Sequence, residues 1–413
     1  MNAGAEFKER PRPLIAPGLP SGWLLLVAGL GIALAVGVAR ITFGVALPAF
    51  TRDLGLSFTI AGALGTLHLI GYLAGTLASP WANNRIGAVR LCRISHLAFA
   101  GGMLISGVAN GPLLLALGRI VAGLAAGFGV FSLFVIVFAA CDPRSRAIAG
   151  SVVWSGIGVA IVVSGMISQP LLELAGAWRW SFLVPAALGV CVAVFITAPK
   201  ADAAAAPPPQ GAAGVRHAVA DILSARWFFL IASYFMFAAA YISYSTFAGA
   251  RLKELAVSPA TTSLFWITFG MASILGSALG AALLAGPRLR YFSLGAALAS
   301  GAVGAVLVVF GSTVSLFGAA FLVGLGLVAT PAITTVLVRN RTSDASYPAM
   351  FMIATASLGL GQLCGPFAAG VLADHFGPMA IGLFSAALYA AGAAFAFGDG
   401  FVSWRSFRAG KAR

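Results

Sequence analysis

Two arginines lie inside long apolar stretches of this sequence. Arg40 follows a run that begins at Trp23, and Arg119 lies within the run 111–140. A guanidinium offers a planar fork of N–H donors that matches a carboxylate or a phosphate. The acidic residues fall in the tails, between the apolar stretches or at their ends, so neither arginine has an obvious counter-charge. This combination predicts a positively charged site that binds an anion.

Other side chains within apolar stretches could complete such a site. Tyr241 and Tyr244 are three residues apart and therefore share one face of a helix. His68 is a candidate proton carrier, because imidazole changes its charge near neutral pH. The candidate substrate-binding residues, besides the two arginines, are Tyr241, Tyr244, Thr334, Gln362 and Trp154.

Each of these candidates also has a structural interpretation. Arg119 could donate to backbone carbonyls where two helices meet, and His68 could be a residue that only packs one helix on another. Ser and Thr in membrane helices often bond their own backbone or a neighbouring helix. The sequence has no Gly-rich phosphate loop with Lys-Ser/Thr, no nucleophile–base–acid set and no cluster of metal ligands. We therefore expect neither an enzyme nor a bound cofactor or metal.

The elements that position these side chains are predicted to be membrane helices. Of the 413 residues, 60% are hydrophobic and 9% are charged, whereas soluble domains carry about 25% charged residues. A bilayer requires about 20 apolar residues per helix, and twelve such stretches recur along the chain. Their predicted ranges are 22–50, 58–82, 91–109, 111–140, 147–174, 179–198, 226–251, 259–285, 291–311, 313–338, 346–373 and 378–399. At 1.5 Å per residue, Arg40 lies ~27 Å along the first range and Arg119 ~12 Å along the fourth, which starts from the opposite side, so we expect the two at similar depth.

One long polar break divides the chain into two halves. The range 199–225 contains an Ala/Pro/Gly-rich stretch without apolar periodicity, which is typical of a linker. It separates an N-terminal six-helix bundle, 1–198, from a C-terminal six-helix bundle with a short tail, 226–413. An even number of helices places both termini on one side, and most Lys and Arg fall on that same side. Cytoplasmic loops collect these residues, so we expect cytoplasmic termini and no nucleic-acid partner despite the net charge of +14.

The two halves also repeat each other. A shift of 201 residues superposes acidic, serine and glycine positions, and it places Tyr241 on Arg40. Parallel six-helix repeats are typical of secondary transporters whose substrate site lies between the halves near the middle of the membrane. We therefore predict an all-α membrane protein with two pseudo-symmetric bundles. The superposed pairs are Asp53–Glu254, Ser57–Ser258, Gly75–Gly276 and Gly123–Gly324, with Gly165–Gly365 after a one-residue slip.

Several local motifs resemble those of the major facilitator superfamily (MFS). The loop "NNRIGAVRL" matches that family's loop after helix 2 through Arg85 and Gly87, although Asn84 stands where the family has Asp. The segment "LGRIVAGLAAGFG" resembles the helix-4 motif through Arg119 and Gly123. Helices 5 and 11 carry partial and fuller versions of the family's antiporter motif. The residues concerned are Gly165 and Pro170 in helix 5, and Gly365 and Pro366 in "GPFAAG" of helix 11.

Within the superfamily, "GVARITFGVALP" and "LIGYLAGTLAS" are similar to the YbfB/YjiJ-like branch. The resemblance implies a secondary transporter that works by alternating access in a bacterial inner membrane. The two arginines favour a small organic anion as its substrate, and we expect a monomer surrounded by lipid. Two alternatives remain open. One is a proton-coupled exporter of hydrophobic or cationic compounds, suggested by the antiporter-like motifs, and the other is a sensor that transports nothing.

Overall fold

The computed structural model describes residues 19–142, 145–172, 174, 176–197, 225–285, 289, 292–342 and 347–411, and this part of the chain is helical without strands. It contains twelve helices long and apolar enough to cross a membrane, as predicted. The elements are α1 Gly22–Ile32, η1 Ala33–Thr42, α2 Phe43–Leu54, α3 Phe58–Ile86, α4 Ala88–Gly107, α5 Pro112–Ala139, α6 Arg146–Leu172, η2 Ala177–Arg179, α7 Trp180–Phe195, α9 Ala225–Glu254, α10 Pro259–Ala285, α11 Ser293–Phe310, α12 Thr313–Arg341, α13 Tyr347–Phe376 and α14 Met379–Lys411.

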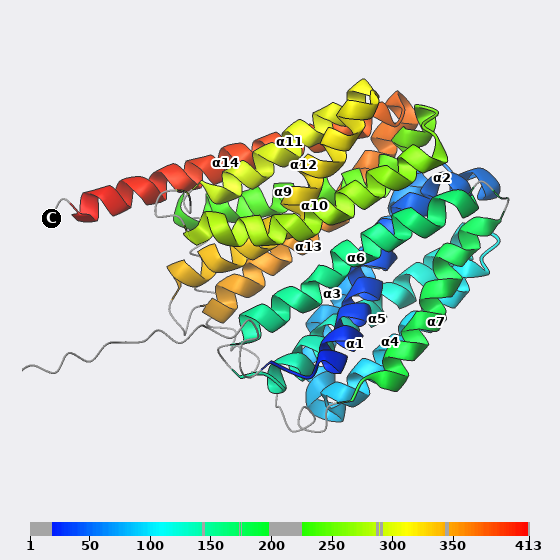
Figure 1. Cartoon of the computed structure of the whole chain (residues 1–413), viewed down its shortest axis with the longest axis horizontal. Helices are drawn as coiled ribbons and strands as arrows, with labels where there is room; N and C mark the ends of the chain where they lie inside the picture. Colours follow the sequence, from blue (N-terminus) through cyan, green and yellow to red (C-terminus); the bar gives the residue numbers. More distant parts are fainter. Residues whose placement is uncertain are drawn as a thin grey trace, which may run out of the picture.

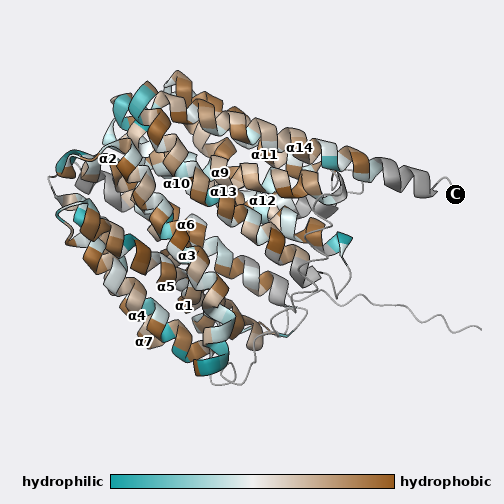
Figure 2. Cartoon of the chain, turned by 180° about the vertical axis from the view of Figure 1, so that it is seen from behind, coloured by the Kyte–Doolittle hydropathy of each residue, from teal (hydrophilic) through white to brown (hydrophobic). Residues whose placement is uncertain are grey.

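The helices form two groups, α1–α7 and α9–α14, as Figure 1 shows. We call the end where α1 begins and α14 finishes the terminal end, and the end where α2 leads into α3 the far end. The predicted linker 199–225 lies outside the described residues except for Ala225, which begins α9. Figure 2 shows hydrophobic residues along the length of both groups, with hydrophilic residues concentrated near the helix ends. Exposed apolar side chains such as Leu113 and Val314 fit a lipid environment.

Helix boundaries follow from residues at the turns. Ser57 and Ser258 each accept a hydrogen bond of 3.2 Å from the N–H three residues on, which satisfies a donor that a helix start leaves free. Gly87, part of the predicted loop motif, ends α3 with a φ of 79°. That positive φ is accessible to glycine without steric cost, so the glycine is required by the turn.

The two bundles are built on the same close helix crossings. At each crossing a glycine meets a backbone carbonyl of the neighbouring helix, and a Cβ at that glycine would overlap the carbonyl. Small residues allow helix backbones to approach in membranes. Both members of each N-terminal pair return 201 residues later in the C-terminal bundle, which confirms the predicted pseudo-symmetry. The pairs are Gly75–Leu124 and Gly123–His68, followed by Gly276–Leu325 and Gly324–Phe269.

The bundles contact each other close to the far end. Gly44 of α2 packs on the carbonyl of Ser245 in α9, and Gly62 of α3 packs on the carbonyl of Pro366 in α13. The carboxylate of Asp374 at the end of α13 accepts hydrogen bonds from the first N–H groups of α3. These contacts hold the N-terminal and C-terminal bundles together at one end of the molecule.

One ion pair departs from the sequence-based assignment of cations to loops. We expected Arg341 in a loop, but α12 continues through it. Its guanidinium bonds both carboxylate oxygens of Asp399 in α14, at 2.6 and 2.5 Å, and Asp399 is buried. The ion pair joins the end of α12 to α14 and supplies the counter-charge of a buried carboxylate.

Candidate functional site

Arg40 lies on a widened segment of the first membrane helix. Residues Ala33–Thr42 form a π-helix between α1 and α2, and π segments frequently mark functional sites. The Arg119 guanidinium of α5 donates a 2.7 Å hydrogen bond to the Ala39 carbonyl within this segment. Insertion of a side-chain donor into the backbone ladder is a known cause of such local rearrangement. The widened helix therefore places Arg40 and the Ala39 carbonyl toward α3 and α5 at the same depth.

The Arg40 guanidinium is buried and has one edge free. Its Cζ lies 4.2 Å from the centre of the Tyr72 ring, so a cation–π contact covers one face. Its Nε and Nη2 atoms are buried and have no hydrogen-bond partner. These two nitrogens form the side-on edge of the guanidinium, which is one of the forks that bind carboxylates with two parallel bonds. This edge of Arg40 thus has the donor geometry that two parallel bonds to a carboxylate require.

Arg119 is held more firmly than Arg40. Besides its bond to the Ala39 carbonyl, its Cζ lies 4.4 Å from the centre of the Phe43 ring. Its Nε has no partner, and the side chain is almost fully buried. This hydrogen bond agrees with the structural interpretation of Arg119, because it joins α5 to the first membrane helix. The same residue still contributes its charge to the space beside Arg40.

His68 of α3 lies close to both arginines. Its Nδ1 is 3.3 Å from the carbonyl of Arg119 and is the donor in that pair, since a carbonyl only accepts. Its Nε2 is buried without a partner. The ring is fully buried and feels the charges of both Arg119 and Arg40. Arg40, His68 and Arg119 thus lie close together, and each has at least one buried nitrogen without a hydrogen-bond partner.

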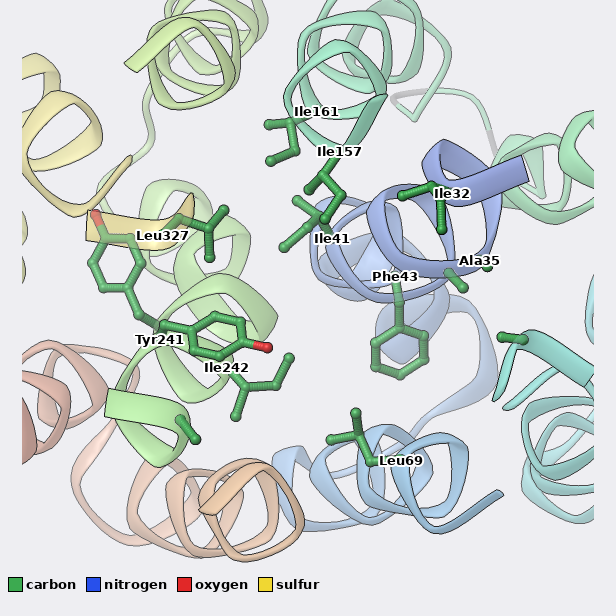
Figure 3. Close-up of a cluster of buried hydrophobic side chains, with 14 of the residues drawn as sticks. Ile32, Ala35, Ile41, Phe43, Leu69, Ile157, Ile161, Tyr241, Ile242 and Leu327 are labelled. Atoms are coloured by element: carbon green, nitrogen blue, oxygen red, sulfur yellow. The ribbon is translucent and has the colours of Figure 1, made fainter. Parts of the chain in front are cut away.

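A small cavity lies where these side chains meet. It measures about 10 Å³, which is space for roughly one water molecule. Both bundles contribute to its wall, and Figure 3 shows Phe43, Leu69 and Ile242 converging from α2, α3 and α9. The sequence predicted that Arg40 and Arg119 lie at similar depth, and both line this cavity. The complete lining is Arg40, Phe43, Gly65, His68, Leu69, Arg119, Ile242, Thr246 and Pro366.

Tyr241 and Gln362 belong to the C-terminal bundle and form a polar pair near Arg40. The Gln362 amide donates a 2.5 Å hydrogen bond to the Tyr241 hydroxyl. Tyr241 also stacks on Phe237, with 4.9 Å between ring centres, and lies within interacting distance of the Arg40 guanidinium. Tyr241 and Gln362, which the sequence proposed separately, therefore form one polar pair opposite the arginine.

Of the predicted substrate-binding residues, Arg40 and Arg119 line the cavity, whereas the other five do not: Tyr241, Gln362, Tyr244, Thr334 and Trp154. Tyr244 stacks on Phe269 inside the C-terminal bundle, with 6.3 Å between ring centres. A step of three residues turns a side chain by about 60° from its predecessor, and here that turn directs Tyr244 into its own bundle. Thr334 is buried in α12, and Trp154 of α6 packs on Phe134 of α5 at 5.2 Å.

The predicted conformational motif residues lie at helix contacts and turns. The Arg85 guanidinium covers the Trp81 ring at 4.8 Å on an exposed surface. Gly165 packs beside Trp266 of α10, which joins the two bundles, whereas Gly365 packs on the Ala239 carbonyl within the C-terminal bundle. The side chain of Pro170 lies outside the described residues.

Sequence analysis missed the two rings that cover the guanidinium groups. Tyr72 is four residues beyond His68 and so lies on the same helix face. Phe43 follows Arg40 by three residues. Their spacing from the charged residues was a usable signal, because a buried cation without a carboxylate can be stabilised by an aromatic face.

Comparisons with known proteins agree with this architecture. A sequence profile described as "Uncharacterised MFS-type transporter YbfB" matches residues 32–398. The Multidrug resistance protein B homolog of Mycobacterium tuberculosis is 31% identical over 38% of this chain and 29% of that protein. The 4-hydroxybenzoate transporter PcaK of Acinetobacter baylyi is 24% identical over 39% of this chain and 35% of that protein. Each match thus spans about a third of the relative's length. The crystal structure of the nucleoside transporter NupG shares the fold, with a TM-score of 0.72 and 16% identity over 92% of this chain and 98% of that one.

Proposed function

The chain belongs to the family of YbfB-like MFS transporters, and on that basis we propose that it carries a small organic anion across the membrane by alternating access. The observation that carries this proposal is the free side-on edge of Arg40, buried beside Arg119 and His68. In the described part of the chain, neither arginine forms an ion pair with a carboxylate. Burying an unpaired cation at this depth is unfavourable, so an anionic ligand supplies the missing counter-charge.

The orientation follows from the distribution of cations. With Lys and Arg gathered at the terminal end, both termini lie in the cytoplasm of a bacterial cell. The contacts between bundles near the far end then close the anion site from the outside. The bundles of residues 1–198 and 226–413 act as the two moving parts, and one monomer contains the complete site.

His68 serves as the proton carrier in this proposal. Its Nδ1 is occupied by the Arg119 carbonyl, so in the neutral ring Nε2 carries a lone pair, and this atom is buried without a partner in a residue that lines the anion site. A carboxylate that arrives there is repelled by a lone pair and attracted by an N–H. Binding of the anion therefore favours protonation of Nε2, which couples anion transport to the movement of a proton.

The second candidate function is export of hydrophobic or cationic compounds. It is supported by the similarity to a multidrug resistance protein homolog and by the glycine contacts of α6 and α13. Substrate charge separates the two candidates. A cation would have to enter a cavity that contains two guanidinium groups, and like charges at such distances repel strongly in a low-dielectric site.

The test is transport of labelled benzoate by protein in proteoliposomes, comparing the native chain with Arg40→Gln and Arg40→Lys. Loss of a charge-assisted bidentate bond costs about 1.5–3 kcal/mol, so uptake by Arg40→Gln should fall at least tenfold. Lys keeps the charge without the fork, so benzoate uptake by Arg40→Lys should lie between that of the native chain and that of Arg40→Gln. Arg90→Gln, which removes an exposed guanidinium, is the matched control. Equal benzoate uptake by Arg40→Gln and the control, with both proteins folded, would contradict the proposal.

A further inference from the structure

The walls of the anion site differ sharply in polarity. Arg40 and Arg119 provide charged groups and His68 a ring nitrogen, whereas Phe43, Leu69 and Ile242 provide apolar surface. Among the other lining residues, Gly65 and Pro366 add no polar side-chain group, and Thr246 adds one hydroxyl. A ligand in this site therefore meets nitrogen atoms from three side chains and hydrocarbon from most of the other lining residues.

The Arg40 guanidinium restricts the direction from which an anion can approach. The Tyr72 ring covers one face of the Arg40 guanidinium, so an anion reaches the free Nε and Nη2 atoms from within the guanidinium plane. A planar carboxylate satisfies both donors in that direction. The body attached to that carboxylate then extends into the apolar part of the cavity.

The apolar walls discriminate between carboxylates by their bodies. Each hydroxyl on the body loses its bonds to water and has few partners on these walls, and an unsatisfied buried polar group is costly. Each methylene gains by leaving water. We infer that the substrate is a carboxylate with an apolar body, aromatic or aliphatic, and that sugars and polyhydroxy acids are excluded. This inference rests on the proposed function and adds the chemical class of the substrate.

The cavity in this structure is much smaller than such a ligand. Phe43 and Ile242 come from different bundles, so a small displacement of one bundle relative to the other widens the space between them. The structure thus describes the site with its walls closed on each other, and binding of the apolar body separates the N-terminal wall from the C-terminal wall.

The test is calorimetric titration of the full-length protein in detergent with acetate, propionate, butyrate and valerate. Affinity should rise about fourfold with each added methylene until the walls are filled. Lactate differs from propionate by one hydroxyl and should bind about tenfold more weakly. Affinities that stay level along the series, or lactate binding as tightly as propionate, would overturn the inference.

Two variants test whether the apolar wall causes the preference for longer carboxylates. Ile242→Ser should weaken valerate binding severalfold more than it weakens acetate binding, and Ile242→Val is the matched control that keeps the wall apolar. The native series needs no variant, so it remains decisive even where Ile242→Ser fails to fold. If the series is level but Arg40→Gln still abolishes binding of every acid, the apolar-body inference fails and anion transport stands. If Arg40→Gln leaves binding of every acid unchanged, both fail.

Discussion

The carboxylate of Asp374 accepts a 2.7 Å hydrogen bond from the backbone N–H of Thr59, and this bond joins the C-terminal bundle to the N-terminal bundle. The same carboxylate accepts a second bond, of 2.8 Å, from the N–H of Phe58. The first N–H groups of a helix have no partner within it and carry the positive end of the helix dipole. An acidic side chain of α13 thus caps α3 across the interface, at the end of the molecule where the bundles are in contact.

Replacing Asp374 by Asn should loosen this end. An amide keeps one acceptor oxygen but loses the charge, so the interaction with the helix start weakens by about 1 kcal/mol. Amide hydrogen exchange at Phe58 and Thr59 should then become about fivefold faster. Asp53→Asn is the matched control, because Asp53 accepts a 2.9 Å bond from the Gly176 N–H within the N-terminal bundle. Unchanged exchange at Phe58 and Thr59 in Asp374→Asn would show that the carboxylate does not hold the bundles together.

The two arginines should respond differently to substitution. Arg119→Gln removes the donor to the Ala39 carbonyl and leaves a buried acceptor without its partner, which costs about 1–3 kcal/mol of stability. Arg40→Gln takes no donor from a backbone carbonyl of this kind; it loses the contact with the Tyr241 hydroxyl and about 1 kcal/mol of cation–π energy with Tyr72. Thermal unfolding in detergent should therefore place Arg119→Gln below Arg40→Gln, while benzoate uptake falls in Arg40→Gln. The reverse order of melting temperatures would contradict the assigned roles.

The repeated glycine crossings should be equally sensitive in both bundles. A Cβ at Gly123 would overlap the His68 carbonyl, and a Cβ at Gly324 would overlap the Phe269 carbonyl. Overpacking of this kind costs about 1–3 kcal/mol, so Gly123→Ala and Gly324→Ala should lower the melting temperature by similar amounts. Gly101 of α4 has no atom within 4 Å of an added Cβ, and Gly101→Ala should leave stability unchanged or raise it by up to about 1 kcal/mol. A marked difference between the two buried glycines would argue against equivalent crossings.

Binding of benzoate should draw a proton from solution. The experiment follows the colour of a pH indicator in weakly buffered protein as benzoate is added near neutral pH. His68→Gln keeps an amide donor for the Arg119 carbonyl but has no group that takes up a proton. The uptake of protons from solution should therefore disappear in this variant, while benzoate still binds. His375→Gln is the control, since His375 is exposed at the far end of α13. Proton uptake that persists in His68→Gln would exclude this residue as the carrier.

The helical framework could be predicted because each of its determinants is local. Stretches of apolar residues identify membrane helices in any arrangement, since lipid requires every backbone bond to be satisfied within the segment. The rise of a helix per residue then placed Arg40 and Arg119 at similar depth, and the repeat of 201 residues aligned Tyr241 with Arg40. Helix ends were less accurate, because a helix can continue beyond its apolar stretch, as α12 does through Arg341.

What the sequence by itself determined was the number of helices, their pairing into two related halves and the presence of buried cations without nearby acids. Only the tertiary structure decided what each cation does. Arg119 donates a hydrogen bond to the Ala39 carbonyl, 80 residues away, whereas the Nε and Nη2 atoms of Arg40 have no partner. Likewise, Asp374 meets Thr59 across 315 residues. Hydrogen bonds depend on directions and distances of a few ångströms, and those arise only when helices remote in the chain are packed against each other.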